Sequence, residues 1–124
     1  MLSDIQIKKK IDALSIKLNL GNFQEVIAEA NLLLKKNKHQ VFFNILCLAY
    51  QGIKEFGKSE AVMNEALKLN PNNPYFLNNM GTTQHKMGNF TAAENYFLRG
   101  LKIVPNYINV LNNLGNLKRD LDNT

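Results

Sequence analysis

The amino-acid sequence predicts an all-α fold in which pairs of helices stack on one another, and three observations support this prediction. Landmark residues recur about every 34 positions, a period typical of units made of two helices. Between the landmarks, apolar residues recur at three- and four-residue intervals, as on one face of a helix. No strand-like alternation of useful length appears. A unit this short cannot bury its apolar face alone, so neighbouring units must pack together.

The repeat is visible at five sets of equivalent positions along the chain. These sets, spaced by 33 or 34 residues, are Phe23, Phe56 and Phe90; Asn44, Asn78 and Asn112; Leu46, Met80 and Leu114; Cys47, Gly81 and Gly115; and Pro71 and Pro105. They predict one domain made of a shortened first unit, two full units and a single last helix. The corresponding ranges are 3–39, 40–73, 74–107 and 108–123.

Local start and stop signals divide the chain into about seven helices. Ser3 followed by Gln6 can form a capping box, which starts the first helix. Asn73 can cap the fifth helix, with Pro74 at its first position, where a missing amide proton costs nothing. Glycines mark the turns, with Gly52 and Gly57 bracketing the third. The predicted helices are 3–19, 23–36, 41–51, a fourth ending at 70, then 74–87, 90–104 and the remaining residues to about 122.

Size and composition fit a small domain without a membrane-spanning segment. The chain has 124 residues, of which 45% are hydrophobic, and no run of about 18 apolar residues. The amino terminus lacks the apolar core of a secretory signal. Cys47 is the single cysteine, so no intrachain disulfide can form. A reducing cytoplasm is therefore the expected location.

The formal net charge is +5, and most of it lies near the first repeat. A nucleic acid or an acidic protein could dock on this charge. Solvated helix ends are the favoured interpretation, because lysines near a helix carboxyl end suit its dipole. Nucleic acid is therefore not an expected partner. The lysines concerned are Lys8, Lys9, Lys10, Lys35, Lys36 and Lys38.

The sequence holds no pattern typical of a catalytic or metal site. His39 and His85 lie far apart, and neither has a cysteine or histidine at ligand spacing. Nothing near Cys47 would lower its pKa, so a packing role is favoured over a nucleophile. No phosphate-cradling loop or serine elbow is present. We therefore expect no cofactor, no metal and no enzymatic activity.

The motifs in the third unit resemble a tetratricopeptide repeat. These motifs are Leu77-x-x-Met80-Gly81, Gly88-Asn89-Phe90-x-x-Ala93, Phe97, Gly100-Leu101 and Pro105. The resemblance extends over nearly the whole chain and implies a right-handed α-solenoid of tandem antiparallel helix pairs. Cys47, Gly81 and Gly115 share a column that should be small, because the two helices of one repeat cross closely there.

The resemblance also implies that the first helix of each repeat lines a concave groove. The positions expected to face this groove hold Asn44, Asn78, Asn79, Asn112, Asn113 and Asn116. An amide both donates and accepts, so a ladder of asparagines could bind the backbone of an extended peptide. Tyr75 and His85 could add an aromatic wall. The alternative is a structural ladder, in which the asparagines hydrogen-bond a neighbouring helix.

The expected function is therefore a protein-interaction scaffold that binds a peptide or partner segment in the groove. A site for a terminal carboxylate is less favoured, because the cations Lys9, Lys86 and Arg119 lie in the wrong columns. The second hypothesis is a substrate-presenting, amino-terminal part of a larger transferase, because the last repeat is only half present.

The last helix carries an apolar stripe of four leucines, Leu111, Leu114, Leu117 and Leu121. Repeat stacks need a polar cap at their ends, so an exposed stripe predicts that something covers it. A homodimer through this carboxyl-terminal helix is the simplest cover. Alternatively, Leu111 and Leu114 face the preceding helix, and only Leu117 and Leu121 are exposed.

Overall fold

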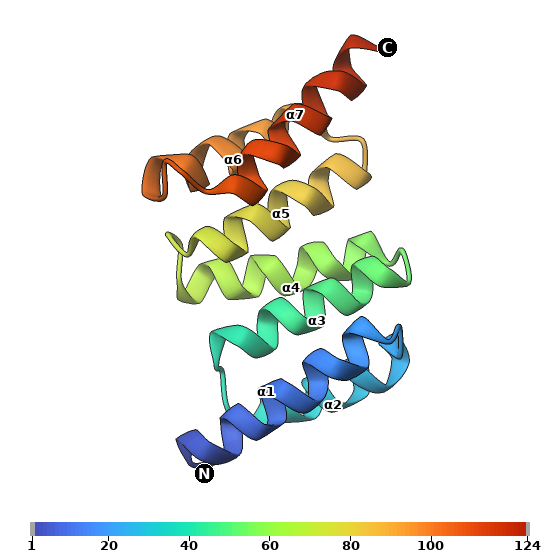
Figure 1. The fold of residues 1–124 in the computed structure, drawn as a ribbon, viewed down its shortest axis with the longest axis vertical. Helices are drawn as coiled ribbons and strands as arrows, with labels where there is room; N and C mark the ends of the chain where they lie inside the picture. The colour runs from blue at the N-terminus through green and yellow to red at the C-terminus, as the bar shows by residue number, and fades with distance from the viewer. Residues whose placement is uncertain (1, 124) are drawn as a thin grey trace. The chain divides into compact units, whose positions relative to one another are not determined.

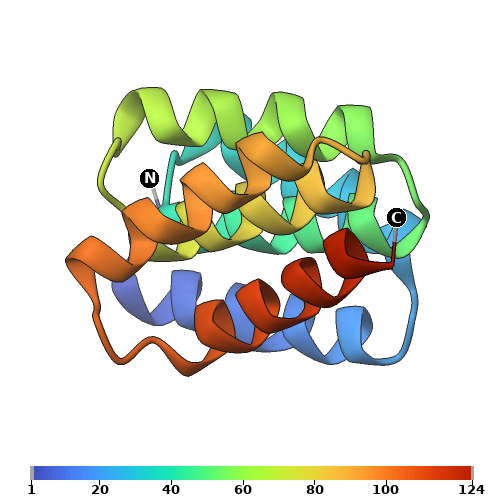
Figure 2. The same ribbon diagram turned by 90° about the horizontal axis from the view of Figure 1, so that it is seen from above.

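The structure is a computed structural model that describes residues 2–123. It consists of seven α-helices, and no strand occurs among these residues, so the predicted all-α class is confirmed (Figure 1). The helices are α1 (Asp4–Asn19), α2 (Phe23–Lys36), α3 (Gln40–Gly52), α4 (Phe56–Leu69), α5 (Pro74–Lys86), α6 (Phe90–Ile103) and α7 (Ile108–Asp122). Figure 2 shows the same helices from above.

Two helix starts have the caps that the sequence predicts. At α1, the Ser3 hydroxyl accepts a hydrogen bond from the Gln6 backbone at 3.2 Å, and Gln6 Oε1 accepts from the Ser3 backbone at 2.8 Å. At α5, the Asn73 side chain accepts from the two backbone amides that follow Pro74. Both caps satisfy amides that have no partner within the helix.

The turns between paired helices each hold one residue with a positive φ. Gly21 has φ 81°, Gly88 has φ 83° and Lys54 has φ 61°. Each lies two residues before a phenylalanine of the repeat. Gly52 and Gly57 flank the α3–α4 turn as expected, but the positive φ falls on Lys54 between them. Gly52 is the last residue of α3, where a Cβ would collide with the Phe23 ring.

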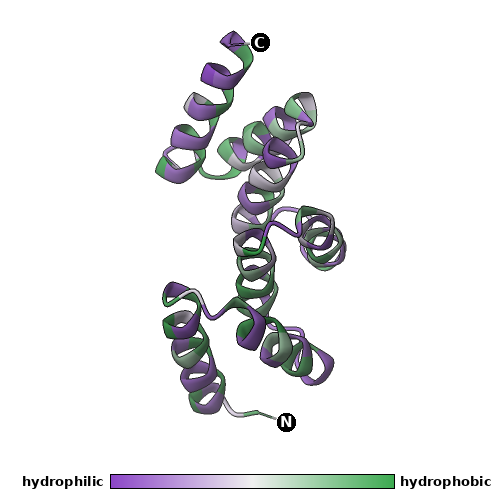
Figure 3. Ribbon diagram, turned by 90° about the vertical axis from the view of Figure 1, so that its right-hand side faces the viewer, coloured by the Kyte–Doolittle hydropathy of each residue, from purple (hydrophilic) through white to green (hydrophobic). Residues whose placement is uncertain are grey.

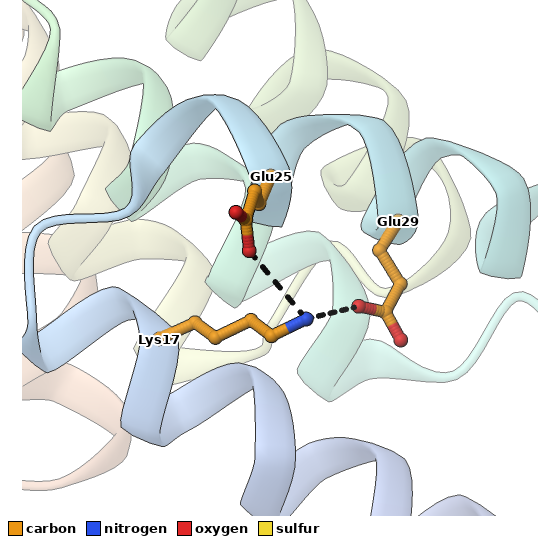
Figure 4. A network of polar contacts seen from close by, with 3 residues as sticks. All are labelled: Lys17, Glu25 and Glu29. Carbon is orange, nitrogen blue, oxygen red and sulfur yellow. Dashed lines mark hydrogen bonds and ion pairs between the residues drawn. The ribbon is translucent and has the colours of Figure 1, made fainter.

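The helices form two compact units, residues 1–62 and 63–124, and α4 passes from one to the other. In the first unit, α1, α2 and α3 pack together, and α1 buries only Ile7 and Leu14. Lys17 of α1 also lies 3.7 Å from Glu25 and 3.4 Å from Glu29 of α2 (Figure 4). These partly exposed ion pairs contribute little stability, so burial holds this unit together.

In the second unit, α5, α6 and α7 all contact one another. Its core cluster, contributed by α6 and α7, consists of Ala93, Phe97, Val110, Leu114 and Leu117. Figure 3 shows that each helix carries both hydrophobic and hydrophilic residues, as this one-sided burial requires. At the end of α6, Leu101 is only partly buried, and Val104, the C-cap residue, is 37% exposed.

The column of small residues behaves differently at its two glycines. A Cβ at Gly81 would collide with the Phe97 ring, so the close helix approach predicted there is confirmed. A Cβ at Gly115 would meet nothing within 4 Å, so close approach does not explain that glycine. An added Cβ at Gly115 would instead point into open space.

Candidate functional site

The first helices of the last two repeats, α5 and α7, face each other through a row of polar and aromatic contacts. On α5 this row is Tyr75, Asn78, Thr82 and His85, whose spacings of three and four residues put them on one side of the helix. Their partners are Tyr107, Asn113 and Asp120. We call these seven residues the α5–α7 face.

A pair of asparagines lies at the centre of the α5–α7 face. Asn113 Nδ2 donates to Asn78 Oδ1 at 2.8 Å and to Thr82 Oγ1 at 3.4 Å. The Asn113 amide nitrogen has two protons, and this geometry engages both. All three side chains are half-buried. The asparagines expected to line a groove therefore first bond each other, as in the structural alternative, and this bond fixes their orientation.

A short polar contact between side chains joins the two helices at one end of the face. His85 Nε2 lies 2.6 Å from Asp120 Oδ2, and the His85 side chain is only 14% exposed. The His85 ring also packs edge-on against Phe90, with the ring centroids 5.7 Å apart. His85 was expected to form an aromatic wall for a ligand, but the structure places its ring against residues of the chain itself.

Two tyrosines lie at the other end of the face. The rings of Tyr75 and Tyr107 pack edge to face, with centroids 5.9 Å apart. Burial raises the pKa of Tyr107, and the neighbouring Tyr75 raises it further. Tyr75 itself is 57% exposed, so it can still contact a ligand as predicted.

The remaining asparagines are not brought into this row. Asn112 and Asn116 are exposed on α7, and Asn116 Oδ1 accepts a hydrogen bond from Arg119 at 2.8 Å. Asn79 is half-buried on α5, next to Asn78. Asn44 is half-buried on α3, in the other compact unit. Within the second unit, the structure therefore brings together Asn78 and Asn113 rather than Asn78 and Asn112 of the predicted column.

Three residues of the face, Thr82, Tyr107 and Asp120, were not predicted from the sequence. The sequence contains a signal for Asp120, which lies one repeat and one residue after His85. The Asn78–Asn113 and His85–Asp120 pairs each join residues 35 positions apart, one more than the repeat. Residues that touch across neighbouring first helices are thus offset from the column that the repeat defines.

The leucines of α7 contradict both predictions made for them. Leu117 is fully buried and Leu114 is 8% exposed, whereas Leu111 is 47% and Leu121 is 39% exposed. The buried pair belongs to the core cluster with Phe97. Because two of the four leucines are buried in this core, α7 lacks the continuous exposed apolar stripe on which the predicted homodimer depended.

Other kinds of site have little support in residues 2–123. These residues contain no group of three or more histidine, cysteine or acidic side chains that could hold a metal ion. None of their helices is long and apolar enough to cross a membrane. Cys47 is buried, and its backbone carbonyl accepts a hydrogen bond from Ser59 Oγ at 3.3 Å. That bond ties α3 to the start of α4.

Two solved structures have a similar fold over most of the chain. The first tetratricopeptide repeat (TPR) domain of human RPAP3 has a TM-score of 0.85 and 19% sequence identity, covering 91% of this chain and 90% of that domain. The first TPR domain of Spaghetti (RPAP3) was solved with the HSP90 peptide SRMEEVD. It has a TM-score of 0.81 and 20% sequence identity, covering 90% of this chain and 89% of that domain. No curated protein matches the chain by sequence.

Models of the tetratricopeptide repeat match the middle of the chain. One covers residues 39–73, and another covers residues 62–95. The second begins in α4 and ends in α6, so it includes α5 with Asn78. Together with the structural similarity, these matches show an α-solenoid of helix pairs. Residues 39–95 therefore carry tetratricopeptide repeat sequence, within a chain whose fold is similar to that of two TPR domains.

Proposed function

We propose that this chain is a non-catalytic scaffold that binds an extended segment of a partner protein on the first helices of its repeats. The fold supports this proposal, because one of its structural neighbours was solved with a bound peptide. That peptide is a ligand of the neighbour. What we infer for this chain is the class of ligand, a protein segment in extended conformation.

The observation that carries the proposal is the Asn78–Asn113 hydrogen bond of 2.8 Å. The bond uses the Asn78 oxygen and the Asn113 nitrogen, so the remaining groups are the Asn78 amide protons and the Asn113 oxygen. A peptide backbone offers a carbonyl acceptor and an amide donor, which complement these two groups. Because the pair is already oriented by its own bond, little side-chain entropy is lost when a ligand binds.

The charges around the face favour recognition of the backbone over recognition of a terminal carboxylate. Arg119 already donates to Asn116, and His85 is paired with Asp120. Lys86 is exposed at the end of α5, whereas Lys9 lies in the other compact unit. A carboxylate bound at this face would therefore have few cations to pair with.

The test measures peptide affinity by fluorescence anisotropy, with SRMEEVD and the best binders from an arrayed peptide library as probes. Replacing Asn78 and Asn113 with alanine should weaken binding by about 1–3 kcal/mol, since two hydrogen bonds are lost. Asn106→Ala, an exposed asparagine in the turn before α7, is the matched control and should leave affinity unchanged. Circular dichroism verifies that each variant keeps its helices.

Amidating the carboxyl terminus of each peptide separates the two kinds of recognition. Backbone binding predicts almost equal affinity for the amidated and free peptides. A large loss on amidation would instead indicate a carboxylate site. If no peptide binds, or if the double alanine variant binds as tightly as the unmodified chain, the proposal is wrong.

A further inference from the structure

A second surface lies on α4 and α6, away from the α5–α7 face and within the second compact unit. It contains two adjoining hollows of about 650 Å³ and 360 Å³, which share Tyr96 and Arg99 in their walls. Leu98 and Lys102 line the larger hollow, and Lys68 lines the smaller one. We call these five residues the α4–α6 patch.

The patch lies on the side of α6 opposite to its buried side. The buried residues of α6 are Ala93, Phe97 and Gly100. Tyr96 is half-buried, Arg99 and Lys102 are exposed, and Leu98 is 47% exposed. Because α6 packs on α5 and α7 through its buried side, a ligand on the patch would not compete with one on the α5–α7 face.

Arg99 is held in a defined position at the centre of the patch. Its guanidinium lies over the Tyr96 ring, 5.5 Å from the centroid, and Nη2 donates to the backbone carbonyl of Pro71 at 3.3 Å. A guanidinium has five N–H donors, so most of them remain for a ligand. Restraining the side chain in advance lowers the entropy that binding must remove.

The charged residues that line the two hollows are all cations, namely Lys68, Arg99 and Lys102. We propose that the α4–α6 patch binds an acidic segment of a partner protein, with carboxylates on the three cations and an aliphatic side chain on Leu98. Arginine suits this role because its planar fork matches a carboxylate. A nucleic acid fits less well, because its affinity depends on the number of phosphates that are neutralised, and three cations neutralise few of them.

The test uses a fluorescein-labelled peptide, acetyl-Glu-Asp-Leu-Glu-Asp-amide, titrated with the full chain at low salt. Saturable binding is expected. The triple variant Lys68→Gln, Arg99→Gln, Lys102→Gln should bind at least about tenfold more weakly, because each charge-assisted contact contributes to affinity. Leu98→Gln should weaken binding about threefold through lost apolar contact. If the triple variant loses helical content, Arg99→Gln alone provides the comparison.

A matched triple variant controls for general charge attraction. Lys8→Gln, Lys9→Gln, Lys10→Gln removes the same charge from exposed positions on α1 and should leave affinity unchanged. Equal weakening by both triple variants would overturn the proposal, as would the absence of saturable binding. Tighter, patch-dependent binding of oligothymidylate or of phosphatidylserine vesicles would also overturn it, in favour of phosphate recognition. If the Asn78→Ala, Asn113→Ala double variant no longer bound the acidic peptide, the peptide would bind to the α5–α7 face rather than to the α4–α6 patch.

Discussion

Helices α5 and α7 are the first helices of successive repeats, yet they differ in how deeply they are buried. The six buried residues of α5 are Phe76, Leu77, Met80, Gly81, Thr83 and Gln84, whereas α7 buries only Val110, Leu114 and Leu117. Equivalent positions therefore have unequal roles. The repeat determines where a helix forms, and the neighbours of that helix determine which of its residues are buried.

Gln84 shows how completely α5 is enclosed. It occupies the column in which Tyr50 stands in the preceding repeat, and it is only 5% exposed. Its oxygen accepts a hydrogen bond from Asn89 at 2.9 Å, and its nitrogen lies 3.6 Å from the Met80 sulfur. A buried amide is tolerated here because both of its ends have partners.

The largest effect should come from removing the side chain that joins α5 to α6. Phe97 is fully buried, and its ring lies against Gly81. Phe97→Ala should lower the free energy of unfolding by about 3–5 kcal/mol, since it removes apolar contact and leaves a cavity. Leu101→Ala is the control and should cost clearly less, because Leu101 is only partly buried. Chemical denaturation measures both, and equal losses would show that Phe97 is not central to this core.

The two glycines of the small-residue column test the same contrast between α5 and α7. Gly81→Ala places a methyl group against the Phe97 ring and should destabilise the chain by about 1–3 kcal/mol. Gly115→Ala meets no such neighbour and should stabilise it by about 0.5–1 kcal/mol, because alanine is the better helix former. Thermal unfolding gives both values. Changes of the same sign would contradict the difference between the two helices.

A double-mutant cycle tests whether the asparagine bond links α5 to α7. Alanine at Asn78, at Asn113 and at both should reveal a coupling free energy of about 0.5–1.5 kcal/mol in chemical denaturation. The matched cycle uses alanine substitutions at Asn78 and Asn112 instead. Asn112 lies 34 residues after Asn78, in the same column of the repeat, but its side chain is exposed. This cycle should show almost no coupling. Equal coupling in the two cycles would mean that the register of the bond is wrong.

The sequence was sufficient to predict the helices because their boundaries depend on local chemistry. The Ser3 box, the Asn73 cap with Pro74, and Gly21 and Gly88 in the turns each act within a few residues. Lys54 shows the limit of this approach, since the positive φ of the α3–α4 turn falls on a lysine, which no local signal in the sequence indicates.

The candidate site could be predicted only in part. The 34-residue repeat identified Asn78 and Asn113 as separate candidates but not as a pair. Contact between two helices depends on how the helices cross, which the repeat does not reveal. That crossing shifts the contacts to a separation of 35 residues. The error at Leu117 has a similar cause. An apolar stripe does not reveal which side of it meets a core until the partner helix is placed.

The smallest predicted effect concerns Tyr107, which lies at the N-cap position of α7 beside Tyr75. Burial, and then the neighbouring Tyr75, raise the pKa of Tyr107 above its ordinary value of 10.0. The folded state therefore retains this proton more firmly than the unfolded state does. The resulting stability is fully present below pH 10.0 and is lost as the pH rises through the raised pKa.

Unfolding experiments across the alkaline range, together with the ultraviolet absorbance of tyrosinate, measure this effect. Tyr107→Phe should remove the highest-pH component of the absorbance titration and flatten the alkaline loss of stability. Tyr75→Phe should remove only the smaller contribution to the raised pKa, because burial is its main cause. If Tyr75→Phe restored an ordinary pKa to Tyr107, the interaction between the two rings, rather than burial, would control the start of α7.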